Sequence, residues 1–99
     1  MANSKQAEKR IRQSLIRRDR NRAAMSRLRT SIKRLRSAAD SDVTKARELL
    51  PSTLGLIDVT AQKGAIHANA AARRKSRLTR LVNRRAEAAG EAEAAESSD

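Results

Sequence analysis

The net charge of this 99-residue chain changes sign in blocks, and these blocks limit how much of the chain can be buried. Residues 1–37 carry a net charge of +11 and residues 63–85 carry +8, whereas residues 38–62 carry −2 and residues 86–99 carry −5. Charged side chains are rarely fully buried, so the core must come from aliphatic residues over about half of the chain. The sequence therefore predicts one small domain that presents two cationic segments to a polyanion.

The chain contains no aromatic residue and no cysteine. Sheet and barrel modules that read single-stranded RNA stack bases on aromatic rings, so this class of domain is not expected, although arginine can still stack on a base. Without cysteine there are no disulfides or thiolate sites, and a reducing, cytoplasmic compartment is expected. No apolar run is long enough to span a bilayer. The Arg-rich start differs from a mitochondrial presequence, because the cationic pattern returns at residues 63–85.

A long first helix is predicted over about residues 4–37, because strong helix formers dominate this stretch and Gly and Pro are absent from it. Asn3 as N-cap and Gln6 three residues later form a capping-box pattern. Residues 17–22 are polar all round, and a helical apolar stripe begins only afterwards, at Met25, Leu28, Ile32, Leu35 and Ala39. The second half is therefore expected to join a bundle while the first half projects as a cationic rod. The heptad pattern is too short for a coiled coil.

A second helix is predicted after the cap-rich turn at residues 40–42. Its apolar stripe consists of Val43, Ala46, Leu50, Leu54, Ile57 and Ala61, widened by Leu49 and Leu56. Pro51 removes one helical hydrogen bond and clashes with the preceding turn, so either the helix kinks there or a new helix begins with Pro51 in its first turn. Gly64 is expected to close this helix at its C′ position.

A third helix is predicted from an N-cap at Asn69 to about residues 86–89, with Gly90 ending it. Its buried face is expected to consist of Ala72, Leu78, Leu81 and Val82. The fold class is therefore all-α: a three-helix bundle with an overlong N-terminal helix projecting from it. Residues 87–99, rich in Ala, Glu and Ser, are expected to form a disordered acidic tail, which leaves residues 1–86 as the folded domain.

The run of basic residues at 73–77 surrounds the opening turns of the third helix. A charge run is usually a solvated surface, but no acid in residues 63–85 can pair with this one. Unpaired like charges three and four residues apart destabilise a helix, so a bound polyanion is the expected compensation.

Nothing in the sequence predicts an enzyme or a metal site. His67 is the one histidine and there is no cysteine, so no zinc-type ligand set can form around it. A capping or nucleic-acid-contacting role is expected for His67 instead. Paired carboxylates in an apolar setting, a nucleophile–base motif and a Gly-rich phosphate loop are all missing. No catalytic residue, metal, cofactor or small-molecule substrate is therefore expected.

Three segments, in their order and spacing, resemble a known family. They are MANSKQAEKRIRQ at residues 1–13, RDRNRAAMSRLRTSIKRL at residues 18–35 and QKGAIHANAAARRKSRL at residues 62–78. From Ala2 to about Arg85 the chain resembles the family of the bacterial small-subunit ribosomal protein number twenty. The resemblance implies a three-helix bundle that binds small-subunit ribosomal RNA directly and early in assembly. It also implies contact with the 5′ domain and the base of the long penultimate stem, and few or no protein partners.

By matching position, the resemblance implies RNA contacts from two groups of residues. The first group is Lys5, Lys9, Arg10, Arg12, Arg17, Arg18, Arg20, Asn21, Arg22, Arg27 and Arg29. The second is Lys63, His67, Asn69, Arg73, Arg74, Lys75 and Arg77. Two features depart from the family pattern: Pro51 and Gly55 stand where the middle helix usually continues, and an acidic extension follows Ala86.

Two rival functions remain open at this stage. A nucleoid-type DNA-compacting protein explains the charge equally well, but it does not explain the ordered motifs. A membrane-surface peptide would need a broad apolar face on the first helix, which the polar belt at residues 17–22 opposes. We therefore expect a structural RNA-binding protein of the ribosome that clamps RNA segments by neutralising their phosphates.

Overall fold

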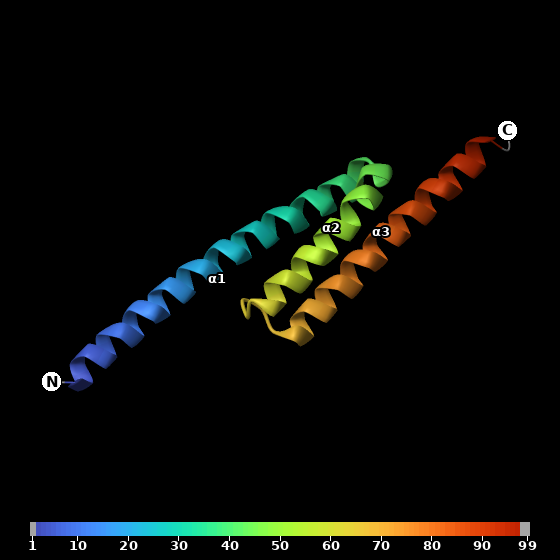
Figure 1. The fold of residues 1–99 in the computed structure, drawn as a ribbon. Coiled ribbons are helices and arrows are strands. Elements are labelled where there is room, and N and C mark those ends of the chain that lie inside the picture. The colour runs from blue at the N-terminus through green and yellow to red at the C-terminus, as the bar shows by residue number, and fades with distance from the viewer. Residues whose placement is uncertain (1, 98–99) are drawn as a thin grey trace.

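The chain folds into three α-helices, with no strand among the residues that the structure describes. The computed structural model describes the backbone of residues 2–97 and the side chains of residues 4–90. α1 spans Ala2–Ser41, α2 spans Val43–Gln62 and α3 spans Ala68–Ser97, and successive helices run antiparallel (Figure 1). α2 packs against both neighbours, whereas α1 and α3 contact each other much less. The predicted all-α bundle with an overlong N-terminal helix is confirmed.

The molecule is elongated because α1 extends far beyond the bundle. α1 has 40 residues, which corresponds to about 60 Å of helix. The principal extents are 83 × 20 × 13 Å, and the radius of gyration of 20.0 Å exceeds the roughly 13 Å of a compact chain of this size. Every residue from Ser4 to Arg20 is exposed. These residues form the predicted projecting rod, and "the rod" denotes residues 4–20 below. The predicted N-cap Asn3 lies outside the described side chains.

The turn between α1 and α2 consists of a single residue, Asp42. Its N–H donates to the carbonyl oxygen of Ala38 at 2.7 Å, and its side chain accepts from the N–H of Lys45 at 3.4 Å. The predicted caps therefore act here, although α1 continues to Ser41, about four residues beyond its predicted end. Small side chains permit so tight a reversal, since Ala38, Ala39 and Ala46 are buried where the two helices meet.

Pro51 lies inside α2 without ending it. The helix is continuous from Val43 to Gln62, so the alternative in which a new helix begins at Pro51 is wrong. Proline has no N–H, which leaves the carbonyl oxygen of Arg47 without its usual helical donor. Both Pro51 and Arg47 are exposed, so water can serve that oxygen. The exposed position explains why the helix tolerates the proline.

Gly64 ends α2 as predicted. It has a φ of +80°, in the left-handed region that favours glycine. The N–H of Gly64 donates to the carbonyl oxygen of Ala61 at 3.0 Å, and the N–H of Ala65 donates to that of Thr60 at 3.1 Å. This pair of bonds is the Schellman arrangement of a helix C-terminus. It directs the chain back toward α3.

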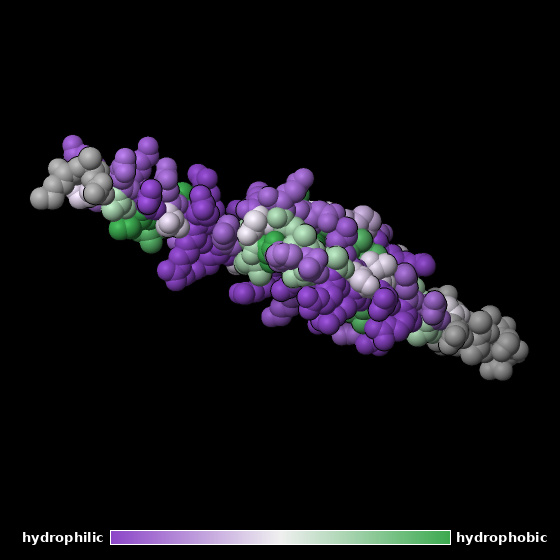
Figure 2. All heavy atoms as spheres, turned by 90° about the horizontal axis from the view of Figure 1, so that it is seen from below, coloured by the Kyte–Doolittle hydropathy of each residue, from purple (hydrophilic) through white to green (hydrophobic). Residues whose placement is uncertain are grey.

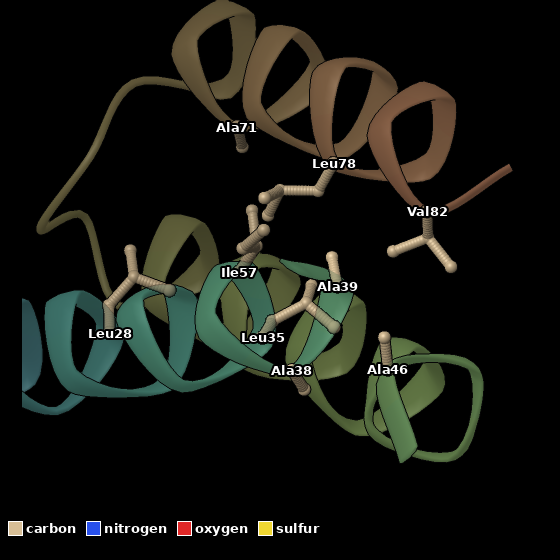
Figure 3. Packing of buried hydrophobic residues seen from close by; sticks show 9 residues of the cluster. All are labelled: Leu28, Leu35, Ala38, Ala39, Ala46, Ile57, Ala71, Leu78 and Val82. Carbon is tan, nitrogen blue, oxygen red and sulfur yellow. The ribbon is translucent and has the colours of Figure 1, made fainter. Parts of the chain in front are cut away.

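The core lies where the second half of α1, α2 and the middle of α3 meet. Its fully buried large side chains are Leu28, Leu35, Ile57, Leu78, Val82 and Thr60. Leu78 of α3 and Ile57 of α2 point toward one another across the interface (Figure 3). The predicted α1 stripe is confirmed in full, since all five of its residues belong to the core cluster or pack against it. The α3 stripe is wrong at its start, because Ala71 is buried and Ala72 is exposed.

Two buried threonines of α2 were not predicted. Thr53 is 4% exposed and Thr60 is 1% exposed. Each hydroxyl donates to the carbonyl oxygen four residues earlier, Thr53 to Leu49 at 3.0 Å and Thr60 to Leu56 at 2.7 Å. These bonds satisfy the hydroxyls, so both side chains can be buried at low cost. Because α2 lies between α1 and α3, it is buried on two sides and needs more than one aliphatic stripe.

α3 is longer than predicted. It continues through Gly90 to Ser97, whereas the sequence predicted that Gly90 would end it. Residues 86–97 are dominated by Ala and Glu, which are strong helix formers, and one glycine costs only about 1 kcal/mol in such a context. The C-terminal part of α3 extends past the α1–α2 turn (Figure 1). The division into a folded domain at residues 1–86 and a tail at residues 87–99 stays a prediction.

Candidate nucleic-acid interface

The rod carries positive charge over most of its circumference, although one side, centred on the exposed Leu15, bears both of its acids, Glu8 and Asp19, and no cation. The predicted RNA-contact residues on it are all exposed: Lys5, Lys9, Arg10, Arg12, Arg17, Arg18 and Arg20. Successive residues of a helix are about 100° apart, so these side chains point in many directions. Figure 2 shows hydrophilic residues over most of one face of the molecule, together with a green hydrophobic patch on the rod and paler green areas over the bundle. The rod is therefore suited to a polyanion that contacts it from more than one side.

A groove between α1 and α3 gathers four arginines. Arg36 of α1 lies on one wall, and Arg73, Arg74 and Arg77 of α3 lie on the other. Ile32, Ala70 and Leu78 complete the lining of this groove, whose volume is about 280 Å³. No acidic side chain belongs to this lining. The α1–α3 groove, as we name it, thus offers planar guanidinium donors from two helices to one anionic ligand.

A second hollow lies where the rod leaves the bundle and passes the α2–α3 turn. Its cationic residues are Arg17, Arg20 and Arg27 of α1 and Lys63 of the turn. Gln13, Ile16 and Asn21 complete the lining, and the volume is about 720 Å³. This rod–turn hollow brings Lys63 to residues that lie 36 or more positions earlier in the sequence. It joins the two groups of predicted RNA-contact residues.

The other predicted RNA-contact residues of α1 line neither the α1–α3 groove nor the rod–turn hollow. Arg18, Arg22 and Arg29 are exposed along α1. Arg10 borders a shallow depression on the rod together with Gln6, Ala7 and Ile11. Lys5, Lys9 and Arg12 lie on the rod outside all three cavities. The predicted residues therefore form an extended surface with two concave sites and not one pocket.

Among the described side chains, two ion pairs join α3 to the other helices. Lys75 Nζ lies 3.0 Å from Asp58 Oδ1, and Arg85 Nη2 lies 3.0 Å from Asp40 Oδ1. All four side chains are substantially exposed, so each pair contributes about 0.2–1 kcal/mol at most. Lys75 is the only predicted contact residue that forms an ion pair within the described side chains. Its charge is directed toward α2 and is less available to a ligand than those of Arg73, Arg74 and Arg77.

His67, and not Asn69, caps α3. The Nδ1 atom of His67 accepts from the N–H of Asn69 at 3.1 Å, and the carbonyl oxygen of His67 accepts from the N–H of Ala71 at 3.0 Å. The predicted N-cap at Asn69 is therefore wrong by two residues, while the predicted capping role of His67 is confirmed. The side chains of His67 and Asn69 are both exposed. They follow Lys63 of the rod–turn hollow by four and six residues in the sequence. Imidazole is an uncommon cap, which is why the sequence favoured asparagine.

Several exposed cations near these sites were missed by sequence reasoning. Arg36 is the clearest case, because it forms one wall of the α1–α3 groove. Arg80 and Arg84 follow Arg77 at spacings of three and seven, which places them along the same side of α3. Both are exposed, and Arg84 Nε donates to the carbonyl oxygen of Arg80 at 3.5 Å. Helical spacing from Arg77 could have found the last two, whereas Arg36 needs the packing of α1 against α3.

Neither a metal centre nor a membrane span is found in the described part of the chain. Among side chains 4–90, no group of three or more His, Cys, Asp or Glu residues is placed to hold a metal ion. Among the described helices, none is long and apolar enough to cross a membrane.

The family of the chain follows from sequence comparison. A family model described as Ribosomal protein S20 matches residues 2–83. The chain belongs to the ribosomal protein S20 family. The small ribosomal subunit protein bS20 of Geobacter metallireducens is 50% identical over 84 residues, which cover 84% of this chain and 97% of that protein. The bS20 protein of Geotalea uraniireducens is 51% identical over the same share of both chains, and that of Aquifex aeolicus is 45% identical over 85% of this chain and 90% of its own.

The S20 match covers both concave sites. Residues 2–83 include the rod, the α1–α3 groove and the rod–turn hollow. The S20 family consists of structural ribosomal proteins, so the predicted lack of enzymatic activity and the predicted cytoplasmic location in the ribosome are confirmed. Residues 84–99, which contain the acidic extension, lie outside the family match.

Proposed function

We propose that this chain is a structural constituent of the small ribosomal subunit that binds small-subunit rRNA directly and stabilises its fold during early assembly. The α1–α3 groove is the observation that carries this proposal. It collects Arg36, Arg73, Arg74 and Arg77 from two helices and contains no acid among its lining residues. Repulsion among these like charges raises the free energy of the isolated protein. Phosphates that enter the groove offset this repulsion.

Guanidinium groups suit this ligand better than simple point charges would. Each one is planar and presents donors in a fork that matches two phosphate oxygens. Arginines on opposite walls of one groove can contact successive phosphates of a backbone that passes between α1 and α3. The charged groups stay near the surface, so the groove needs no rearrangement of the apolar core beneath it.

The length of α1 allows one molecule to hold separate RNA segments. The 17 residues of the rod extend about 25 Å from the bundle. A segment bound along the rod and another bound in the α1–α3 groove would otherwise repel each other. The resemblance of the motifs suggests that these segments belong to the 5′ domain and to the base of the long penultimate stem. Recognition of the paired regions is expected to depend mainly on RNA shape.

Residues 1–86 are the proposed RNA-binding domain, and residues 87–99 are a proposed acidic appendage without a share in the interface. All of the predicted contact residues lie before residue 86, and the net charge of residues 86–99 is −5. Negative charge of this density is unsuited to contact with phosphates.

A competition experiment tests the proposal against DNA compaction. Labelled small-subunit rRNA is bound at moderate salt, and unlabelled rRNA or random-sequence duplex DNA is added as competitor. We expect rRNA to compete at least tenfold better than the same mass of DNA, because specific nucleic-acid binding exceeds non-specific binding by orders of magnitude. Equal competition by both would favour the DNA-compacting function and overturn the proposal.

A further inference from the structure

The rod–turn hollow differs chemically from the α1–α3 groove. Both contain several cations, but the hollow also contains two side-chain amides, Gln13 and Asn21, and the apolar side chain of Ile16. Ile16 is 47% exposed, so its surface faces the opening. Amides can bond to ribose and phosphate as well as to bases, whereas an exposed apolar side chain such as Ile16 can pack on the face of an unstacked base. The lining of the hollow therefore suits an unpaired base in addition to phosphates.

The spacing of these residues places them on one side of α1. Gln13, Arg17 and Arg20 follow at intervals of four and three, and Ile16 lies three residues after Gln13 and four before Arg20. Asn21, half-buried, lies at the edge of this group nearest the bundle. Lys63 closes the hollow from the α2–α3 turn, which Gly64 holds in place. The site thus exists only when α1 and the turn are packed together.

We propose that the rod–turn hollow binds one unstacked nucleotide of the RNA, taken from a bulge or loop. The base packs on Ile16 and on an arginine plane. The amides of Gln13 and Asn21 lie about 12 Å apart along the helix axis, so one bonds to the edge of the base and the other to its ribose. The neighbouring phosphates contact Arg17, Arg20, Arg27 or Lys63. An amide offers both a donor and an acceptor, which is what the edge of an unpaired base requires. Arginine can stack on a base where no aromatic ring is present. The volume of about 720 Å³ lies within the usual range for sites that hold a small organic ligand.

This inference rests on the proposed RNA-binding function, and the test separates the two. Small-subunit rRNA is treated with reagents that modify unpaired bases, alone and with the full-length protein. The comparison uses wild type, Gln13→Ala/Asn21→Ala, Ile16→Ser, and the control Asn83→Ala, which removes an exposed amide of α3 away from the hollow. The side-chain amides of Gln13 and Asn21 form no hydrogen bond with the described residues, and Ile16 is outside the core. The helix content of the variants should therefore match that of wild type by circular dichroism.

We expect wild type and Asn83→Ala to protect at least one unpaired base that stays reactive with the other two variants. The double variant should bind rRNA about tenfold more weakly, as the loss of two hydrogen bonds implies, with an unchanged dependence on salt because no cation is removed. If all four proteins protect the same unpaired bases, or none, the inference is overturned while RNA binding stands. If wild type binds rRNA no better than duplex DNA, the proposed function fails first.

Discussion

Removal of one arginine from each wall of the α1–α3 groove should change the salt dependence of RNA binding. Each phosphate contact contributes about −0.7 to −0.9 to the slope of log affinity against log salt. The variant Arg36→Ala/Arg73→Ala should therefore have a slope about 1.4–1.8 smaller in magnitude than wild type. Over a fourfold rise from about 50 to 200 mM salt, wild type should then lose roughly seven to twelve times more affinity than the variant.

The same substitution should leave the fold intact or stabilise it slightly. Arg36 and Arg73 are exposed, neither forms an ion pair within the described side chains, and alanine is the better helix former. Filter binding at four salt concentrations measures the slope, and thermal melting followed by circular dichroism measures the stability. The matched control is Arg47→Ala, which removes an exposed arginine of α2 outside both concave sites. An unchanged slope in the double variant, or an equal change in Arg47→Ala, would refute phosphate binding in this groove.

Three further predictions concern the core, the α3 cap and the C-terminal segment. Ile57→Ala, at a fully buried position, should lower the free energy of unfolding by about 2–5 kcal/mol, whereas Val59→Ala, at a position 42% exposed, should lower it by under about 1 kcal/mol; similar chemical-denaturation midpoints would show that Ile57 is not central. His67→Ala should lower the melting temperature by the loss of a cap worth about 1 kcal/mol, while His67→Asn should retain it; three equal melting temperatures would contradict the capping role. Deletion of residues 87–99 should leave rRNA affinity unchanged or raise it, because acids can compete with RNA for cationic surfaces; a clear loss in filter binding would mean that this segment helps to bind.

Most of the fold could be predicted because the chain is rich in helix formers and its aliphatic residues recur at helical spacing. The stripe at residues 25–39 shows this well, since each of its apolar residues enters or borders the core. The errors arise where the packing of the helices or the neighbouring residues override the propensity of a single residue. Pro51 is tolerated because it lies on the exposed side of α2, and Gly90 fails to end α3 because helix formers surround it. Thr53 is buried only because α2 has neighbours on two sides.

The candidate site was less predictable than the fold. Motif resemblance selected arginines that are close in sequence, such as Arg73 and Arg74, but the α1–α3 groove also requires Arg36 from another helix. Lys75, from the same basic run, points toward α2 and pairs with Asp58. Only the packing of the helices determines which cations share a concave surface and which are used within the protein. A charge count along the sequence carries no such information.

Salt should act in opposite directions on the free protein and on its RNA complex. In the free protein, the two exposed ion pairs of the described side chains contribute about 0.2–1 kcal/mol each, while the arginines of the α1–α3 groove repel one another without an acid among its lining residues. Added salt screens both terms, and the repulsion among many like charges exceeds the attraction of two exposed pairs. The melting temperature of the free protein should therefore rise with salt while RNA affinity falls. A melting temperature that falls as salt rises would show that the attraction within the Lys75–Asp58 and Arg85–Asp40 pairs exceeds the repulsion among the cations. The groove would then need no polyanion to offset that repulsion.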